Sequence, residues 1–219
     1  MSLAYEIIPV TPFQQNCSLI WCTETKHAAL VDAGGETQRL LDAVKRHGVT
    51  LEKLLVTHGH LDHISGVRTL QDQLHLPVEG PHRDDAFWID ALPQICAQYG
   101  FPPAQGFTPD RWLQQGDTVT VGKQVLEVLH CPGHTPGHVV FYHRPSDLVI
   151  VGDVLFQGSI GRTDFPRGNH ADLIRSIRSR LFALGDSVQF IPGHGPMSTL
   201  GAERRTNPFV SDAAVAGRG

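Results

Sequence analysis

Residues 57–63 read Thr-His-Gly-His-Leu-Asp-His. This short stretch contains four side chains of types that can bind metals: His58, His60, Asp62 and His63. Neutral imidazole and carboxylate are ligands that divalent zinc, iron and manganese all accept. Three histidines and one aspartate are more than a single tetrahedral ion readily takes from one loop. The stretch therefore indicates two neighbouring metal sites that share this loop.

The length of 219 residues is enough for one large domain with a substantial core, and the 41% hydrophobic content is ordinary for a globular protein. A net charge of -4 argues against a nucleic-acid groove as the main surface. The sequence shows neither a membrane-spanning apolar run nor a signal peptide at its start. We expect a cytoplasmic protein with one domain over residues 1–210 and a disordered tail over 211–219.

The four cysteines are Cys17, Cys22, Cys96 and Cys131, and no two of them form a Cys-x-x-Cys pair. We expect free thiols in a reducing cytoplasm, because a chain of this size does not need disulfides for stability. Cys131 lies three residues before His134, which would suit a residue near a metal. The alternative is that Cys131 is a small buried hydrophobic residue, which is the commoner role of a free cysteine.

Alternating and apolar runs predict strands, and apolar spacing of three and four residues predicts helices. A short helix within residues 84–99 is expected to lead into a loop that overhangs the metal site formed by residues 58–63. The main predicted helices cover 37–47, ending at Gly48, then 64–74, and a segment capped by Asn169 that ends at Gly185. The predicted strands cover 5–10, 16–22, 27–31, 54–57, 124–129, 138–143, 148–151 and 188–191.

A weak internal repeat relates residues 16–34 to residues 137–153. Each segment reads as strand, turn, strand and then an aspartate, Asp32 in the first and Asp153 in the second. Two similar halves indicate two sheets packed face to face with helices outside.

The candidate site residues share one position in this pattern. The 58–63 loop, His134, Asp153 and His194 each follow directly after an apolar strand. Strand ends at one edge of a sheet converge, and the loops there are free to carry functional side chains. Other histidines lie in polar or turn-like segments, where we expect surface positions: His27, His47, His75, His82 and His143.

Four motifs in order carry a family resemblance. They are residues 57–63, Cys-Pro-Gly-His-Thr-Pro-Gly-His at 131–138, Val-Gly-Asp at 151–153 and Pro-Gly-His-Gly at 192–195. They resemble the ordered motifs of the metallo-β-lactamase superfamily, over residues 16–194. The resemblance implies an α/β fold, a four-layer αββα sandwich of two mixed sheets with helices outside and a metal site at one edge.

The resemblance also implies a set of ligands. His58, His60 and His134 would hold the first metal, while Asp62, His63 and His194 would hold the second. Asp153 would bridge the two metals, and Asp62 and Asp153 are the carboxylates expected to take part in catalysis. Zinc is the expected metal, with iron or manganese as alternatives, because His and Asp suit all three.

Two further residues are expected to support the ligands. Asp32 resembles a structural aspartate behind the metal loop, which would hydrogen-bond a ligand without binding metal. His138 fits either a similar supporting role or an ordinary position at the start of a strand.

Residues 152–156 and Gly-Arg-Thr-Asp-Phe at 161–165 are similar to the glyoxalase II group, the hydroxyacylglutathione hydrolases. These enzymes hydrolyse S-lactoylglutathione to lactate and glutathione. Two metals would lower the pKa of a bridging water from about 15.7 toward 7, and the resulting hydroxide would attack the thioester carbonyl. Arg162 falls where the group carries a basic residue that contacts glutathione; the alternative is a surface arginine paired with Asp164.

The chain departs from the larger glyoxalase II enzymes, which have a C-terminal helical domain and a tyrosine near Arg162 where this sequence has Asp164. Its pattern is most similar to the short, single-domain bacterial type. The main alternative is a persulfide dioxygenase, which shares the 161–165 stretch and binds one iron on residues matching His58, His134 and Asp153. Residues 192–196 look more like the hydrolase pattern. We therefore expect a thioester hydrolase for a small glutathione conjugate, with no nucleic acid and no membrane as partner.

Antibiotic hydrolysis is less favoured, because nothing points to a secreted protein. The nuclease branches of the superfamily usually add a second domain or an RNA-binding insertion, and this chain has room for neither. Metal binding without catalysis would require a closed site, whereas this ligand set leaves room for a water.

Overall fold

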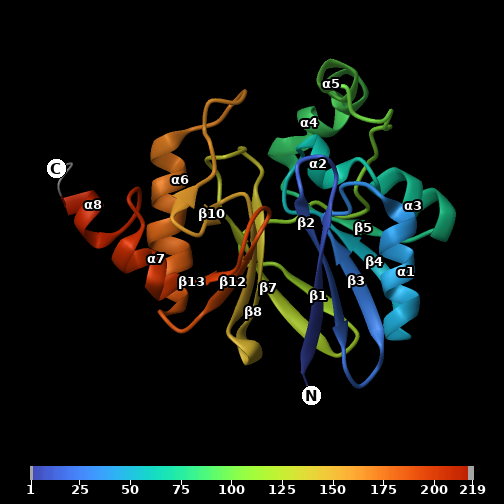
Figure 1. The fold of residues 1–219 in the computed structure, drawn as a ribbon, viewed down its shortest axis with the longest axis horizontal. Coiled ribbons are helices and arrows are strands. Elements are labelled where there is room, and N and C mark those ends of the chain that lie inside the picture. Colours follow the sequence, from blue (N-terminus) through green and yellow to red (C-terminus); the bar gives the residue numbers. More distant parts are fainter. Residues whose placement is uncertain (1, 217–219) are drawn as a thin grey trace.

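The structure, a computed structural model, describes residues 2–216. Two sheets lie face to face and helices cover their outer faces, which confirms the predicted αββα sandwich (Figure 1). Helices α1 and α3 cover one sheet, and helices α6 and α7 cover the other.

The first sheet has the strand order β1-β2-β3-β4-β5. Its first three strands form an antiparallel meander, and β4 and β5 continue it in parallel because helices connect β3, β4 and β5. The strands are β1 (Leu3–Val10), β2 (Gln15–Cys22), β3 (His27–Val31), β4 (Thr50–Leu55) and β5 (Val78–Glu79).

The second sheet has the order β13-β12-β9-β8-β7-β6, and a separate hairpin joins β10 and β11. Strands β6 to β9 are antiparallel, and β12 lies parallel to β9 after the helical crossover through α6. The strands are β6 (Thr118–Val121), β7 (Gln124–His130), β8 (Val139–His143), β9 (Leu148–Gly152), β10 (Leu155–Phe156), β11 (Ser159–Ile160), β12 (Gln189–Pro192) and β13 (Ser198–Thr199).

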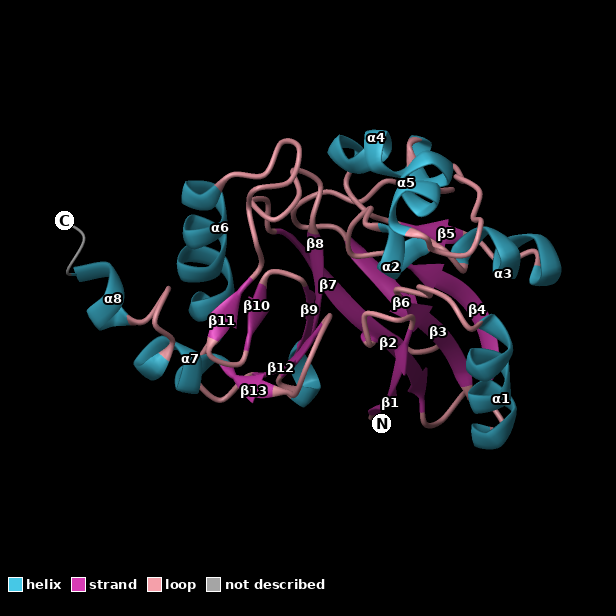
Figure 2. Ribbon diagram, turned by 45° about the horizontal axis from the view of Figure 1, so that its top comes forward, coloured by secondary structure: helices cyan, strands magenta, loops and turns pink. Residues whose placement is uncertain are grey.

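Helices connect these strands, and α4 and α5 lie at one end of the two sheets (Figure 2). The α-helices are α1 (Thr37–His47), α2 (Leu61–Ile64), α3 (Val67–Leu74), α4 (Ala86–Asp90), α5 (Leu92–Tyr99), α6 (His170–Ser176), α7 (Leu200–Thr206) and α8 (Asp212–Ala216). Short 3₁₀ turns are η1 (Arg83–Asp85), η2 (Arg144–Ser146) and η4 (Phe182–Leu184), and a π-helical segment, η3 (Ile177–Leu181), continues α6.

Three apolar clusters form the core. Alternate residues of a strand point to opposite faces of its sheet, so Leu30 packs under the helices of the first sheet while Val31 packs between the sheets. In β9, Ile150 points between the sheets and Val149 points toward α6. Buried on both faces, these strands read as continuous apolar runs.

Helix α1 begins and ends where the sequence predicted, and Gly48 follows it in the left-handed conformation. Asn169 caps α6 as expected, since its side chain accepts a hydrogen bond from the N–H of Asp172 at 3.1 Å. The helix predicted over 64–74 is two helices, α2 and α3, which are interrupted at Ser65 and Gly66. The interruption lets α2 carry the metal-binding motif on a separate short turn.

Two predictions are wrong, one about the C-terminal tail and one about the exposure of His143. Asp212–Ala216 form helix α8 where a disordered tail was expected, because Arg178 and Arg204 both pair with Asp212; residues 217–219 lie outside the described residues. His143 is buried, not on the surface, and bonds Gln124 and Ser146. Its segment reads as a turn, but its ring points inward at the end of β8.

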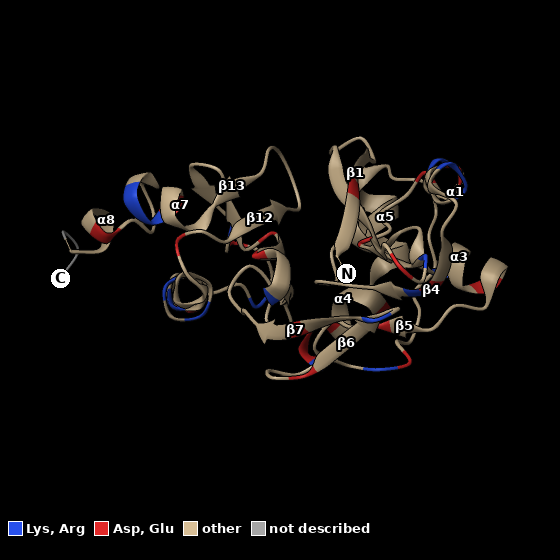
Figure 3. Ribbon diagram, turned by 90° about the horizontal axis from the view of Figure 1, so that it is seen from below, with Lys and Arg blue, Asp and Glu red and all other residues tan. Residues whose placement is uncertain are grey.

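Charged residues of both signs are interspersed over the outer helices and loops (Figure 3). Among residues 2–216, no helix combines the length and apolar character required to cross a membrane.

Candidate metal centre

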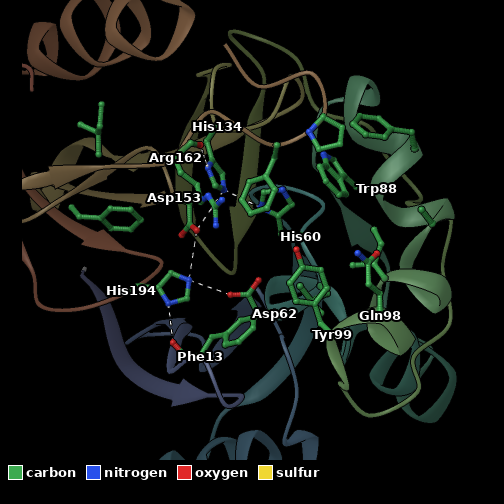
Figure 4. Close-up of a pocket in the computed structure, with 18 of the residues that line it drawn as sticks. Phe13, His60, Asp62, Trp88, Gln98, Tyr99, His134, Asp153, Arg162 and His194 are labelled. Atoms are coloured by element: carbon green, nitrogen blue, oxygen red, sulfur yellow. Dashed lines mark hydrogen bonds and ion pairs between the residues drawn. The ribbon is translucent and has the colours of Figure 1, made fainter. Parts of the chain in front are cut away.

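The predicted site residues come together at one end of the two sheets (Figure 4). Helix α2 and the loop before it carry the first motif, after β4 of the first sheet. The other three residues follow strands of the second sheet: His134 follows β7, Asp153 follows β9 and His194 follows β12. The site therefore lies between the two sheets, where strand ends from both halves of the chain meet.

Three ring nitrogens form the first group. His60 Nδ1 lies 3.2 Å from His58 Nε2 and 2.9 Å from His134 Nε2. Two ligand atoms bound at about 2.0–2.1 Å to one tetrahedral ion lie roughly 3.3 Å apart. The spacing of the three nitrogens is therefore suitable for one shared metal ion.

The second group consists of Asp62, His63 and His194. His194 Nε2 lies 3.1 Å from Asp62 Oδ2, and His63 Nε2 lies 3.8 Å from the same oxygen. The residues of this group come from α2 and from the loop after β12, so the two sheets must pack before the group exists.

Asp153 lies between the two groups. Its Oδ2 is 3.5 Å from His134 Nε2 and 3.6 Å from His194 Nε2, and its Oδ1 is 3.4 Å from His63 Nε2. One carboxylate thus faces nitrogens of both groups, which is the position of a bridging ligand.

The hydrogen bonds of three Nδ1 atoms show which tautomers these histidines adopt. His134 Nδ1–H donates to the carbonyl oxygen of Arg162 at 2.7 Å, and His194 Nδ1–H donates to the carbonyl oxygen of Phe13 at 3.1 Å. His63 Nδ1–H donates to Asp32 Oδ2 at 2.9 Å. In a neutral imidazole the other nitrogen then carries a lone pair, so each of these rings, when neutral, directs an Nε2 lone pair to the site.

Asp32 also supports His58, through Thr57. The Thr57 hydroxyl donates to Asp32 Oδ2 at 2.6 Å and lies 3.0 Å from His58 Nδ1. Since its proton goes to Asp32, this hydroxyl accepts from His58 Nδ1–H. The Thr57 N–H donates to Asp32 Oδ1 at 2.7 Å. Asp32 therefore orients the rings of His58 and His63 without facing the metal groups, as expected from the sequence.

His138 supports Asp153 through a hydrogen bond to its backbone. Its Nε2 accepts a hydrogen bond from the N–H of Asp153 at 3.0 Å, and its ring stacks on His58 with centroids 4.5 Å apart. Of the two roles left open for His138, the supporting role is the one that the structure shows. Cys131 is a buried core residue, and burial raises the pKa of its thiol to about 12.

Burial and neighbouring charges set the protonation of these groups. Burial lowers the pKa of His58, His60 and His134, which keeps these rings neutral and able to bind metal. Burial alone would lower the pKa of His63, but the Asp153 and Asp62 carboxylates raise it well above its ordinary value. Burial alone would raise the pKa of Asp153, but His63 and the other nearby imidazoles hold it well below its usual range.

Three buried atoms of these ligand groups and of Asp153 have no hydrogen-bond partner among the described residues: His60 Nε2, His63 Nε2 and Asp153 Oδ1. Buried polar atoms almost always have a partner, and leaving one unsatisfied costs about 1–3 kcal/mol. A divalent cation held by His63 Nε2 and Asp153 Oδ1 would satisfy these two atoms. The residues present therefore fit divalent metals, on the donor chemistry as well as on the spacing.

Asp85 is a functional candidate that the sequence reading did not single out. Its buried carboxylate accepts hydrogen bonds from Gly59 N–H at 2.9 Å, Thr135 hydroxyl at 2.8 Å and Gly137 N–H at 2.6 Å. Gly59 lies between His58 and His60 of the first group, and Thr135 follows His134, the third residue of that group. Burial raises the pKa of Asp85 to about 6, although the three donors oppose this shift. Asp85 thus ties together the two loops that carry the first group.

A cavity of about 870 Å³ opens over the site and is lined by residues of both metal groups. One wall comes from α4 and α5, and the other comes from β10, β11 and the loop that leads to α6. Figure 4 shows Trp88, Gln98 and Tyr99 on the first side and Arg162 on the other. The sequence predicted that a loop after residue 99 would overhang the site, whereas helices α4 and α5 before that loop form this wall.

Arg162 lines the cavity, and it forms the ion pair with Asp164 that was the alternative to a glutathione contact. Its Nε and Nη2 donate to the two oxygens of Asp164 at 2.7 and 2.6 Å. Its Cζ lies 4.3 Å from the centre of the Phe165 ring. The guanidinium is thus at the site but is already paired with a carboxylate.

Comparison with known proteins agrees with this geometry. The sequence profile of the metallo-beta-lactamase superfamily matches residues 10–194. The chain is 46% identical over 207 residues to the hydroxyacylglutathione hydrolase GloC of Haemophilus influenzae, covering 94% of this chain and 97% of that protein.

Two solved structures have the same fold. The BLEG-1 B3 metallo-beta-lactamase superposes with a TM-score of 0.87 at 34% identity, over 94% of this chain and 99% of that one. TTHA1623 in a di-iron-bound form superposes with a TM-score of 0.85 at 36% identity, over 93% of this chain and 99% of that one. This chain belongs to the metallo-β-lactamase superfamily and resembles its hydroxyacylglutathione hydrolases.

Proposed function

We propose that this metal-dependent hydrolase cleaves the thioester S-lactoylglutathione to lactate and glutathione. The observation that carries the proposal is the pair of ligand groups joined by Asp153, which lies 3.5 Å from His134 and 3.4 Å from His63. The similarity to GloC over 94% of the chain supports the choice of a glutathione thioester.

We assign His58, His60 and His134 to one divalent cation and Asp62, His63 and His194 to a second, with Asp153 shared. When bound, two such cations polarise a carbonyl and supply a hydroxide-strength nucleophile at neutral pH. We propose zinc, and iron is the first alternative because a relative has been solved in a di-iron-bound form. The four free, buried cysteines are consistent with a reducing cytoplasm as the location.

The residues of the chain have distinct tasks in this reaction. Asp62 and Asp153 line the cavity, where their carboxylates can accept hydrogen bonds from the attacking water. Trp88 and Phe165 cover the first ligand group and exclude bulk water from it. No general acid is needed for the leaving group, because a thiol pKa of about 8.5 makes thiolate a good leaving group.

A second candidate is a mononuclear iron persulfide dioxygenase. The residues that this activity would use, His58, His134 and Asp153, also lie together, with His134 Nε2 3.5 Å from Asp153 Oδ2. The second group, Asp62, His63 and His194, does not discriminate, because its residues can be present without a metal. Residues 192–196, which look more like the hydrolase pattern, favour the hydrolase.

The test compares two assays on protein purified without added metal, whose metal content is measured first. Release of thiol from S-lactoylglutathione supports the hydrolase, whereas oxygen uptake with glutathione persulfide and no thiol release would overturn it. His58→Ala and Asp153→Ala should each abolish thiol release. His75→Ala, at an exposed histidine that follows α3, is the matched control and should retain it. Full activity in His58→Ala or Asp153→Ala would show that the site assignment is wrong.

A further inference from the structure

The walls of the cavity are mostly aromatic and aliphatic. On one side, α4, α5 and the residue between them contribute Phe87, Trp88, Ala91 and Ile95; the facing side contributes Phe156, Ile160, Phe165 and Pro166. A volume of about 870 Å³ is near the upper end of ordinary ligand pockets, which run from about 300 to 1,000 Å³. The cavity thus offers a large apolar surface to whatever reacts at the metal groups.

Two of the rings lie directly against the first ligand group. The His60 ring centroid is 4.6 Å from that of Trp88 and 4.7 Å from that of Phe165. The Trp88 and Phe165 centroids are 6.1 Å apart at an angle of 89°. A carbonyl that reacts beside His60 therefore carries its substituent into a space bounded by these rings.

Two arginines hold the aromatic side chains in place. Arg162 Cζ lies 4.3 Å from the Phe165 ring centre, and Arg167 Cζ lies 4.4 Å from that of Phe87. Such contacts are attractive because a guanidinium interacts with the negative face of the ring. One loop thus supports rings on both walls of the cavity.

The charges of the lining do not match the glutathione half of the substrate. Among the described residues that line the cavity, Arg162 is the only arginine or lysine, and both oxygens of Asp164 already occupy it. Glutathione carries two carboxylates, and placing them against an apolar wall without partners is costly. The acyl half of a glutathione thioester is uncharged, so it is the half that suits the apolar walls.

We propose that the cavity selects thioesters by a ring-sized apolar acyl group, so that aryl-substituted 2-hydroxyacyl thioesters are better substrates than the lactoyl thioester. This inference rests on the proposed thioester hydrolysis. The lactoyl side chain is a single methyl group and leaves most of the apolar wall uncovered. One methylene in a hydrophobic pocket changes kcat/KM by about 10–200-fold, so a phenyl ring should raise it at least about tenfold.

The experiment compares S-lactoylglutathione with S-(3-phenyllactoyl)glutathione. Both have the same thiol and the same 2-hydroxyl, so the difference is a phenyl ring on the methyl carbon. Each kcat/KM is divided by the rate of uncatalysed hydrolysis, which removes differences in intrinsic reactivity. The proposal requires a higher ratio for the phenyllactoyl compound, and an equal or lower ratio would overturn it. Hydrolysis of neither compound would instead refute the proposed function.

A second pair of substrates tests whether the acyl group carries the preference. The same two acyl groups are attached to N-acetylcysteamine, an uncharged thiol. The preference for phenyllactoyl should persist on this thiol. A preference that disappears would show that the glutathione half carries the selection, which contradicts the proposal.

Phe87→Ala tests the wall itself, because Phe87 lines the cavity and removing its ring removes apolar surface. The variant should reduce the phenyllactoyl-to-lactoyl ratio of kcat/KM several-fold. Phe209→Ala is the matched control, because Phe209 is a partly exposed phenylalanine between α7 and α8. The control should have the same phenyllactoyl-to-lactoyl ratio of kcat/KM as the unchanged protein. If this ratio is also unchanged in Phe87→Ala, the proposal that this wall binds the acyl group is contradicted.

Discussion

The carboxylate of Asp85 accepts a hydrogen bond from the backbone N–H of Gly59 at 2.9 Å. Gly59 lies between His58 and His60, and the same carboxylate also bonds Thr135 and Gly137 beside His134. One buried side chain thus sets the distance between the two loops that supply the first ligand group. Supporting hydrogen bonds of this kind tune metal affinity in proteins.

Replacing Asp85 with asparagine should weaken metal binding about 10–100-fold, the usual effect of losing a group that supports metal ligands. Asparagine offers one acceptor oxygen, so its NH₂ group would face at least one of the three donors. Competition with a chelator measures the affinity. Asp84→Asn, at the exposed neighbouring carboxylate, is the control, and equal affinities in the two variants would contradict the role of Asp85.

Gly137→Ala should destabilise the protein by about 1–3 kcal/mol, the usual cost of overpacking a core. A Cβ at Gly137 would lie 2.6 Å from the N of Asp85 and 2.7 Å from its Cγ. Denaturant unfolding measures the change. Gly35→Ala provides the comparison, since its Cβ would meet only Thr11 Cγ2, at 3.4 Å. A Gly137→Ala variant as stable as Gly35→Ala would contradict the close packing of Gly137 against Asp85.

Asp164→Asn should lower the KM for S-lactoylglutathione several-fold. The Arg162 guanidinium lowers the pKa of Asp164 to about 2, so the pair is charged at neutral pH and Asp164 competes with a substrate carboxylate. Asparagine removes that competition, whereas Arg162→Ala should raise the KM. The same thioester of N-acetylcysteamine has no carboxylate, so its KM should not change in Asp164→Asn. A fall in KM for both thiols would argue against a carboxylate contact.

His143→Gln should change how stability depends on pH. Burial holds the pKa of His143 below its ordinary value of 6.5, so the unfolded chain binds the proton more tightly than the folded protein. The stability from neutral His143 is complete above pH 6.5 and is lost as the pH falls through the folded pKa. The free energy of unfolding of the unchanged protein should therefore decrease toward that of the variant on acidification. A difference in the free energy of unfolding that stays constant with pH would contradict this role of His143.

Removing the metals should lower the melting temperature and abolish thioesterase activity. Ligand binding stabilises a folded protein by about 2.7 kcal/mol when free ligand is 100-fold above its Kd. Adding Zn²⁺ back should restore both properties, as followed by thermal unfolding and thiol release. The apoprotein should stay folded, because its three core clusters do not depend on the metal groups. Activity that survives complete chelation would exclude metal-dependent hydrolysis.

Features set by neighbouring residues could be predicted from the sequence. Helix α1 runs from Thr37 to His47 as expected, because its apolar spacing and Gly48 are local signals. The positions of the ligands after strands were likewise readable, since a strand and the loop that follows it are adjacent in the chain. Strand β6 (Thr118–Val121) was missed, because four residues carry too little periodicity to be distinguished from a loop.

Other features depended on contacts between distant parts of the chain. Asp85 and Gly137 are 52 residues apart and bond at 2.6 Å, and nothing near Asp85 in the sequence indicates this. His143 was expected on the surface because its neighbours are polar, yet its ring is directed inward to Gln124.

The sequence by itself indicated the sandwich fold, through the family resemblance that its ordered motifs carry. It also indicated the residues that gather at the edge of the sandwich, because strands and the motifs after them are local patterns. Only the tertiary structure decided how these residues are supported and what covers them. It brought Asp85 between two loops, paired Arg162 with Asp164 and enclosed the site in aromatic side chains. The reason is physical: the direction of a buried side chain depends on partners that packing brings near, and those partners lie far away in the chain.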